Sequence, residues 1–272
     1  PLVLFSLITV GYSANALGGA GGPLAVLIIA IVAAELGKAV SKETKVDILV
    51  TPLVTIFAGV GLSMHIAAPI GAAASQVGTL IMWATEQAPL VMGILVSVIV
   101  GVALTLPISS AAICAALGLT GLAGGAAVAG CCAQMVGFAV MSYKENGVGG
   151  LVSQGLGTSM LQMGNIIKNP RIWIAPTLAS AITGPLATCL FHFEMNGAAV
   201  SSGMGTCGLV GQIGVYTGWV SDIAAGTKAA ITPMDWAAMV LLCFVLPAVL
   251  SVVFCAVERK LGWIKEGDLK LN

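Results

Sequence analysis

The stretch Leu151-Val-Ser-Gln-Gly-Leu-Gly-Thr-Ser-Met-Leu-Gln-Met-Gly-Asn165 is rich in glycine and polar residues, within a chain that is otherwise strongly apolar. A break at Lys168-Asn-Pro-Arg171 follows, then an apolar run from Ile172 to Phe191, and then a second glycine-rich segment from Ser201 to Gln212. At membrane depth, non-helical backbone is tolerated only where protein buries it or where it lines a watery cavity. Interrupted segments of this kind indicate a transport site. We therefore expect residues 151–212 to hold the substrate site.

The composition is that of a membrane protein. Of 272 residues, 58% are hydrophobic and only 8% are charged, whereas soluble domains carry about 25% charged residues. About 20 apolar residues span a bilayer as a helix. The runs without a charged residue reach or exceed that length, and they are Ile48–Thr85, Gln87–Tyr143, Asn146–Ile167, Ile172–Phe191, Met195–Ser221 and Trp236–Val257. We predict an all-α polytopic membrane protein, a helical bundle with broken or re-entrant segments.

Several classes of function are excluded. The formal net charge is zero, so no basic stripe is available to neutralise the phosphates of a nucleic acid. The seven cysteines lie in apolar sequence without C-x-x-C spacing, which favours small buried hydrophobes, so we predict no metal site and no cofactor. Gly203-Met-Gly205 is followed by no lysine at Walker spacing, which excludes a nucleotide loop. No nucleophile–base arrangement is recognisable, so no catalytic residue is predicted.

We expect a single transmembrane domain over residues 1–272. Because the chain begins at Pro1 inside an apolar stretch and without a methionine, we expect it to be part of a longer protein. We do not expect a cleaved signal peptide, because no charged leader precedes the apolar run. Pro1–Leu17 is predicted as most of a helix, Gly18–Gly22 as a break, and Pro23 to about Val40 as the next helix. The lysines that follow, and the basic sequence Glu258-Arg-Lys260, favour the cytoplasmic side.

Proline and glycine predict further interruptions in the first half. Ile48–Met64 reads as a helix, and a kink or partial unwinding is expected after it, near Pro69. Pro107 ends the next span. Gly121–Gly125 is expected to interrupt the run Ile108–Met141, where close helix packing is favoured over a ligand role.

Two short polar sequences are informative in the second half. Tyr143-Lys-Glu-Asn146 is predicted to be a polar turn. Thr232-Pro-Met-Asp235 is predicted to start the last helix, from Trp236 to about Val257.

Glu194 is the leading candidate for a solute contact, because ionisable groups within membrane segments are costly and are functional candidates by default. It follows the apolar run that ends at Phe191, with His192 before it and Asn196 after it. A solvated helix end and a solute site are equally compatible with this pattern. A carboxylate beside an amide and an imidazole suits a sugar or polyol.

A neutral polar cluster in the first glycine-rich segment is the second candidate. Each of its side chains needs a partner in lipid, either another helix or an uncharged, hydroxyl-rich solute. His65 completes the candidate set, although donation to a backbone carbonyl at the Pro69 break is slightly favoured over a ligand contact. The cluster consists of Gln154, Thr158, Ser159, Gln162 and Asn165.

The sequence Gly164-Asn-Ile-Ile-Lys-Asn-Pro-Arg171-Ile-Trp-Ile-Ala-Pro-Thr-Leu-Ala-Ser-Ala-Ile-Thr-Gly-Pro-Leu186 resembles the EIIC membrane components of the bacterial sugar phosphotransferase system. Ser202–Gln212 and the final helix from Asp235 are similar to that family's closing order of elements. The resemblance covers residues 45–262. Within the family, the chain looks most like the toxin-regulator-like branch, the perfringolysin regulator type.

The resemblance implies a sugar-like solute, alternating access, a cytoplasmic partner subunit that phosphorylates the sugar, a homodimer, and a multi-pass location in the bacterial inner (plasma) membrane. Two departures stand against the transport reading. The family's Asn-Glu-Pro motif falls near Gly157-Thr158-Ser159, without a glutamate, and Leu106-Pro-Ile-Ser-Ser110 replaces its Gly-Ile-His-Gly. The alternatives are a membrane sensor or regulator that binds a solute without moving it, and a channel or carrier for another neutral solute.

Overall fold

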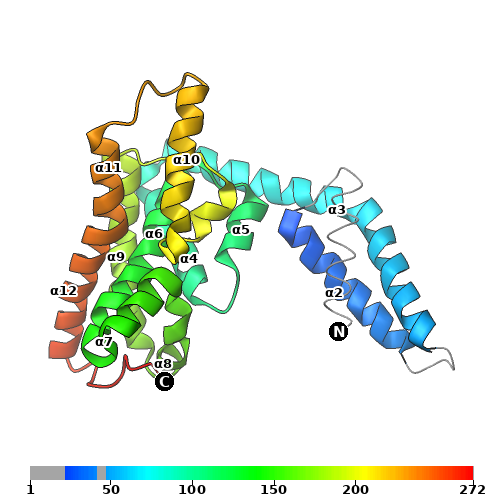
Figure 1. Cartoon of the computed structure of the whole chain (residues 1–272), viewed down its shortest axis with the longest axis horizontal. Helices are drawn as coiled ribbons and strands as arrows, with labels where there is room; N and C mark the ends of the chain where they lie inside the picture. The colour runs from blue at the N-terminus through cyan, green and yellow to red at the C-terminus, as the bar shows by residue number, and fades with distance from the viewer. Residues whose placement is uncertain (1–21, 42–46, 272) are drawn as a thin grey trace. The chain divides into compact units, whose positions relative to one another are not determined.

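The computed structural model describes residues 22–41 and 47–271 (Figure 1). The predictions for Pro1–Leu17, for the break that follows it and for the lysines at positions 42 and 45 lie outside the described residues. The chain divides into two compact units. Of the described residues, those up to 78, with 115–117, form the first unit, and 79–114, with 118–271, form the second. The single domain expected over the whole chain stays a prediction.

The first unit pairs α2 (Gly22–Val40) with the first part of α3 (Asp47–Gln87). Ala25 and Ile29, one helical turn apart, are buried against Ala67 of α3. Further along α2, Gly37 approaches the side chain of Thr55 so closely that a Cβ at position 37 would overlap it. Small residues thus let the two helices pack closely.

The helix α3 is continuous through both of its prolines, Pro52 and Pro69. The partial unwinding considered near Pro69 is therefore not seen. Figure 1 shows α3 changing direction part-way along its length, as helices with an internal proline commonly do.

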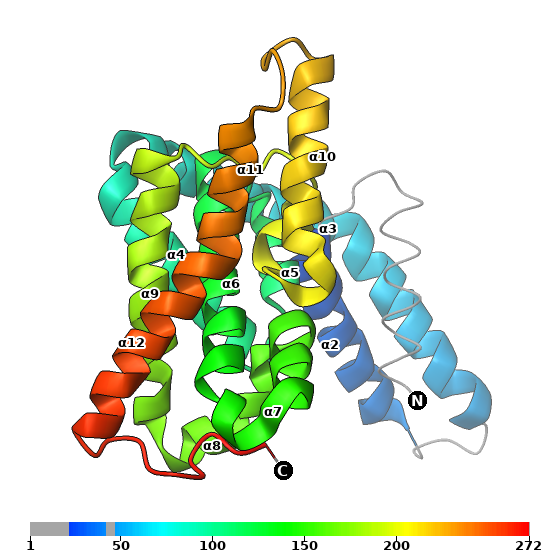
Figure 2. The ribbon, with the colours of Figure 1, turned by 60° about the vertical axis from the view of Figure 1, so that its left-hand side comes forward.

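The second unit is built around α6 (Gly121–Met141), which is buried along nearly its whole length. A helix that is apolar all round its surface is stable only in such a position. Three elements surround it: α4 (Pro89–Thr105), α9 (Ile174–Pro185) and the long helix formed by α11 (Pro233–Val240), a π-helical turn and α12 (Leu246–Lys260). Figure 2 shows α9 and α11–α12 running side by side along the bundle.

Hydroxyl groups tie these helices together. Ser97 of α4 donates to the carbonyl of Ser180 in α9 at 2.8 Å. Ser180 in turn donates to the carbonyl of Gly130 in α6 at 3.2 Å. In lipid, interhelical hydrogen bonds and close packing at small residues take the place of the hydrophobic effect.

Four helical stretches in the described part are long and apolar enough to cross a membrane, namely 49–87, 121–141, 170–190 and 233–260, and the shorter α4 is also apolar. The described residues contain no strand beyond a single bridge between Gly121 and Met195. The prediction of an all-α polytopic membrane protein is confirmed.

The first glycine-rich segment is broken, as predicted. The chain passes from α7 (Tyr143–Val152) through a π-helical turn (Ser153–Gly157), a 3-10 turn (Ser159–Gln162) and α8 (Met163–Lys168). Thr158 and Asn169 are extended, and Asn169 forms the predicted break before the 3-10 turn Pro170–Trp173. The polar turn predicted at residues 143–146 is present as the first turn of α7, because the N–H groups of Glu145 and Asn146 donate to the Ser142 carbonyl and Gly147 then leaves helical geometry with φ 59°.

The break before α6 lies earlier than predicted. After α5 (Ser110–Leu117), Gly118 and Gly121 adopt positive φ values of 64° and 62°, and residues 121–125 then form the first turns of α6. The run Ile108–Met141 is therefore interrupted, as predicted, but at Gly118–Gly121 and not across the whole of Gly121–Gly125. The glycines of that stretch serve packing instead, because a Cβ on Gly125 would overlap the carbonyl of Phe193.

The second glycine-rich segment is also irregular. It contains 3-10 turns at Ala199–Gly203 and Cys207–Leu209 before α10 (Val210–Ala224) begins. Leu209 has a left-handed backbone with φ 60°, which is strained for a residue with a branched side chain. The predicted start signal of the last helix is confirmed, because Thr232 and Asp235 form a reciprocal capping box at α11.

Candidate functional site

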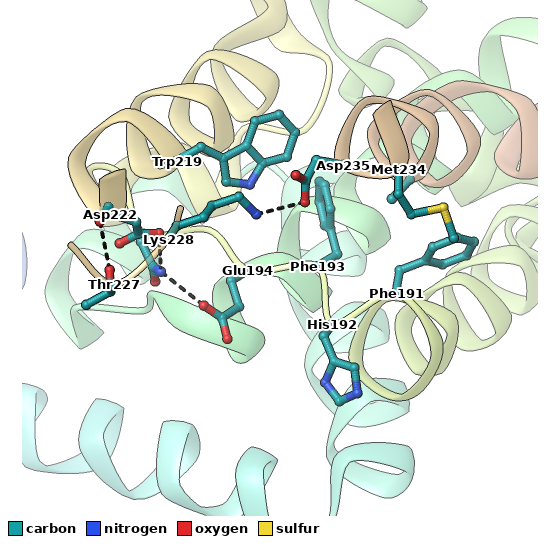
Figure 3. Close-up of a pocket in the computed structure, with 12 residues that line it drawn as sticks. Phe191, His192, Phe193, Glu194, Trp219, Asp222, Thr227, Lys228, Met234 and Asp235 are labelled. Atoms are coloured by element: carbon teal, nitrogen blue, oxygen red, sulfur yellow. Dashed lines mark hydrogen bonds and ion pairs between the residues drawn. The ribbon is translucent and has the colours of Figure 1, made fainter. Parts of the chain in front are cut away.

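A solute-sized cavity lies at one end of the second unit, where the chain leaves α9 and where α10 and α11 are joined by a loop. Its volume is about 490 Å³. We call it the end pocket (Figure 3). It is lined by Phe191, His192, Phe193, Glu194, Asn196, Trp219, Asp222, Thr227, Lys228, Met234, Asp235 and Ala238.

The local backbone explains why Glu194 faces this pocket. The π-helical turn Leu186–Leu190 ends α9, and His192 reverses the chain with φ 44°. The backbone is then held on both sides, by Phe193 N–H donating to the Ala187 carbonyl at 2.8 Å and by the bridge between Met195 and Gly121. Phe193 and Met195 are buried, and the alternation of extended backbone turns Glu194 outward.

Two carboxylates in the pocket share one amide. Asn196 Nδ2 donates to Glu194 Oε2 at 3.1 Å and to Asp222 Oδ2 at 2.9 Å. An amide nitrogen has two N–H groups, so both are used in holding these carboxylates. Each carboxylate keeps an oxygen that can accept a hydrogen bond from a solute.

The opposite wall carries an ion pair. Lys228 Nζ lies 2.9 Å from Asp235 Oδ1 and 5.7 Å from the centre of the Trp219 ring. Trp219 packs edge-on against Trp236, with their ring centres 5.6 Å apart. The positive charge of Lys228 is therefore engaged by Asp235 and does not compensate Glu194 and Asp222.

Three of the predicted residues meet here, namely His192, Glu194 and Asn196. Figure 3 shows the imidazole of His192 pointing away from Lys228 and Asp235, below Phe191. The sequence analysis missed Trp219, Asp222, Lys228 and Asp235 as pocket residues. In the sequence, Lys228 and Asp235 belong to a polar loop and the helix start that follows it, which is indistinguishable from an ordinary connection, and Trp219 and Asp222 belong to α10.

A second cavity, of about 380 Å³, forms where three breaks in the chain converge. Thr158 lines it together with Pro107, Ser109 and Ser110, and with Met204 and Cys207 from the second glycine-rich segment. We call it the break cavity. Residues from 106–110 and 157–159, the two segments that the sequence analysis noted as departures from the motifs of the resembled family, thus line one cavity.

Ser159 belongs to a different, buried network. Its hydroxyl lies 2.8 Å from that of Thr105, and Thr105 donates to Gln134 Oε1 at 3.4 Å. Gln134 also accepts from Trp173 Nε1 at 3.0 Å and donates to Thr177 at 3.3 Å. Gln134 was missed, although it is the only side-chain amide between Ala88 and Tyr143.

The remaining three members of the polar cluster form what we call the amide ladder. Gln162 Nε2 donates to Gln154 Oε1 at 2.9 Å, and Asn165 Nδ2 donates to Gln162 Oε1 at 2.7 Å. All three side chains are buried. In this structure they bond within the protein, which is the internal alternative left open by the sequence.

His65 lies in the first unit, where its side chain is exposed on α3. Among the hydrogen bonds described for the chain, none involves His65, so the expected donation to a carbonyl near Pro69 is not seen. It is not brought together with the other candidates.

Cysteine and metal chemistry add nothing to the site. All seven cysteines are free; Cys189 is exposed and Cys207 partly so, against the expectation that all are buried. Within the described residues, no group of three or more His, Cys, Asp or Glu side chains could hold a metal ion.

The fold and the cavities define a class: a multi-pass helical membrane protein with interrupted segments around solute-sized cavities. The chain matches the family "Phosphotransferase system, EIIC" over residues 1–271. The protein therefore belongs to the EIIC family, the membrane subunits for sugar transport in the phosphotransferase system. No curated protein and no solved structure matches the chain.

Proposed function

We propose that the protein binds a sugar-like solute in the end pocket and moves it across the bacterial inner membrane by alternating access. A separate cytoplasmic subunit phosphorylates the sugar on release. The observation that carries this proposal is the pair of carboxylates, Glu194 and Asp222, held by one amide in a cavity of about 490 Å³. This volume lies within the range of small-molecule sites.

The chemistry of the pocket suits a polyhydroxylated solute. Carboxylates accept hydrogen bonds from hydroxyl groups, and bonds to a charged acceptor are stronger than bonds between neutral groups. Phe191 and the edge of Trp219 supply apolar surface for the C–H face of a sugar ring. With three carboxylates and one lysine on its walls, the pocket disfavours an anionic solute, so we expect it to prefer the unphosphorylated sugar.

The distribution of charge supports an outward-facing pocket. The end of the bundle with the pocket carries Glu194, Asp222 and Asp235 with a single cation, Lys228. Arg259 at the opposite end pairs with Glu145 across 2.6 Å. Under the positive-inside rule the basic end faces the cytoplasm. Figure 2 shows α7, α8 and the end of α12 at the end of the bundle away from the loop between α10 and α11. These elements, with the turn after α8 and the segment after α12, contain Lys144, Lys168, Arg171, Arg259, Lys260, Lys265 and Lys270.

In this proposal the break cavity is the inner part of the path. It lies among interrupted segments, where half-helices and loops can change position without breaking a continuous helix. Its hydroxyl groups offer hydrogen bonds to a neutral solute but no charge. A homodimer, implied by the EIIC family, would leave this path inside each subunit.

A second candidate function is a sensor or regulator of the toxin-regulator type, which binds the solute without translocating it. Two observations favour it: Thr158 stands where EIIC transporters carry a glutamate, and the amide ladder is fully engaged inside the protein. In this reading the end pocket still binds the solute, and the path beyond it stays closed.

Flux separates the two functions. The purified protein is reconstituted into vesicles that enclose the cytoplasmic phosphotransferase subunits and a phosphoryl donor, and a radiolabelled sugar that binds to the protein is supplied outside. A transporter accumulates sugar phosphate inside the vesicles, and this accumulation is lost in Glu194→Gln. Binding without accumulation contradicts transport and supports the regulator.

A further inference from the structure

The segment Leu261–Leu271, which follows α12, packs against the first broken segment. Ile264 and Leu269 are its only strongly buried apolar side chains, at 3% and 0% exposure. They insert into a cluster with Phe138, Ile166 and Ile172. Figure 2 shows the segment running from the end of α12 beneath α8 and α7.

The amide ladder holds the backbone of this segment. Gln162 Nε2 donates to the Leu269 carbonyl at 3.0 Å, in addition to its bond to Gln154. Asn165 Nδ2 donates to the Lys270 carbonyl at 2.9 Å, in addition to its bond to Gln162. Each of these two amides therefore uses both N–H groups, one within the ladder and one on the segment.

Two more asparagines fix the segment at its ends. Asn146 donates to the Leu269 carbonyl and accepts from Leu271 N–H, both at 2.8 Å. Asn169 donates to the Trp263 carbonyl at 2.9 Å. The segment is thus bound largely through its own backbone, whose carbonyl oxygens occupy N–H groups of these amides. Two side-chain contacts add to this, from Asn169 Nδ2 to Asp268 Oδ2 at 2.9 Å and from Arg171 to the ring of Trp263.

The same segment has features of a part that can detach. Apart from its two buried anchors, most of its side chains are exposed. Gly262 and Gly267 have positive φ values of 71° and 91°, a conformation in which glycine turns the chain freely. Segments with few buried contacts and exposed backbone open locally well before the whole protein unfolds. A cavity of about 340 Å³, lined by Ser153, Asn165 and Leu271 among others, already adjoins the ladder.

We propose that Leu261–Leu271 is a strap that opens as a unit while the bundle stays folded. When the strap is closed, its backbone carbonyls accept hydrogen bonds from the side-chain amides of Asn146, Gln162 and Asn165. When the strap is open, these donors are free to face the break between the π-helical turn Ser153–Gly157 and α8. If the protein transports sugar as proposed, this makes the strap an inhibitory contact at the basic end, and its opening is a step in solute release.

Hydrogen–deuterium exchange of the full chain in lipid nanodiscs tests the strap, without any solute. Leu269→Ala removes the buried anchor, and Leu261→Ala is the matched control, because Leu261 is an exposed leucine of the same segment. We expect Leu269→Ala to speed exchange in residues 263–271 at least about tenfold. Exchange in residues 153–168 should also rise, while α6 and α9 keep their protection and Leu261→Ala behaves as the parent.

Asn146→Leu provides a second variant that leaves the apolar anchors in place, and it should speed exchange in residues 263–271 by a smaller factor. The proposal is overturned if neither Leu269→Ala nor Asn146→Leu changes exchange in the segment. It is equally overturned if α6 and α9 lose protection together with the segment, because the segment is then an inseparable part of the core. Since no sugar is present, a failure of the transport proposal does not affect either outcome.

Discussion

The side-chain amide of Asn196 lies 2.9 Å from the carboxylate of Asp222, although 26 positions separate them in the sequence. This bond joins the segment that leaves α9 to the last turn of α10. Because the same amide also holds Glu194, one residue sets the spacing of the two carboxylates in the end pocket. The shape of the candidate site therefore depends on Asn196 as much as on the acidic residues.

We predict that Asn196→Leu lowers the free energy of unfolding by about 1–2 kcal/mol, because it removes hydrogen bonds to charged acceptors at a partly exposed site. The effect should be less than additive with that of Asp222→Leu, since the two residues share one interaction. Thermal unfolding of the single and double variants in detergent measures this coupling. If the two losses in unfolding free energy are strictly additive, the hydrogen bond between Asn196 and Asp222 is not formed in the membrane protein.

Gln134 should be the most sensitive polar residue of the core. Gln134→Leu leaves the indole N–H of the partly buried Trp173 without its acceptor, which is expected to cost about 1–3 kcal/mol. Adding Trp173→Phe should recover part of the loss, because the orphaned donor is removed. The melting temperatures of the two variants and the parent test this order, and a double variant less stable than Gln134→Leu argues against the network.

The contact between α4 and α6 requires glycine at position 130, where a Cβ would overlap the Ser97 carbonyl. Gly130→Ala should destabilise the protein by about 1–3 kcal/mol through overpacking. Gly164→Ala is the control, because a Cβ there meets nothing within 4 Å and alanine favours the helix. If Gly130→Ala and Gly164→Ala melt at the same temperature, α4 and α6 do not approach each other as closely as the structure shows.

The charge asymmetry predicts orientation. In cells carrying a Cys189→Ser background, which removes the exposed thiol, Thr227→Cys should react with a membrane-impermeant maleimide from outside. Lys265→Cys should react only after the cells are opened. The reverse pattern would place the end pocket in the cytoplasm and would exclude it as an entry site for uptake.

Most of the fold could be predicted from the sequence, because hydropathy alone indicates spans such as Ile172–Phe191 and because capping at Thr232 has a local signature. The position of the break before α6 could not be predicted from the sequence. Gly118 and Gly121–Gly125 are equally good helix breakers in isolation. Their roles are separated only by the tertiary contact of Gly125 with the Phe193 carbonyl.

The site could be predicted in part, for a similar reason. Glu194 was indicated because it is an isolated carboxylate between apolar runs, whereas Asp222 in the last turn of α10 and Lys228 in the polar loop after it enter the pocket only through folding. The polar cluster of the first broken segment was treated as one group, but it is divided among three places. Sequence spacing does not predict that division, since Thr158 is extended and the adjacent Ser159 begins a 3-10 turn, so that the two side chains face different environments.

The most direct test of the sugar site compares thermal unfolding of the parent, Glu194→Gln and Glu266→Gln against a panel of sugars, polyols and their phosphates. Glu194→Gln is nearly isosteric, and Glu266→Gln makes the same change at an exposed position of the strap. A ligand at 100 times its dissociation constant adds about 2.7 kcal/mol of stability. We predict that an unphosphorylated sugar stabilises the parent and Glu266→Gln but not Glu194→Gln. Equal stabilisation of all three proteins, or none by the whole panel when another EIIC protein responds to its own sugar, would contradict the account.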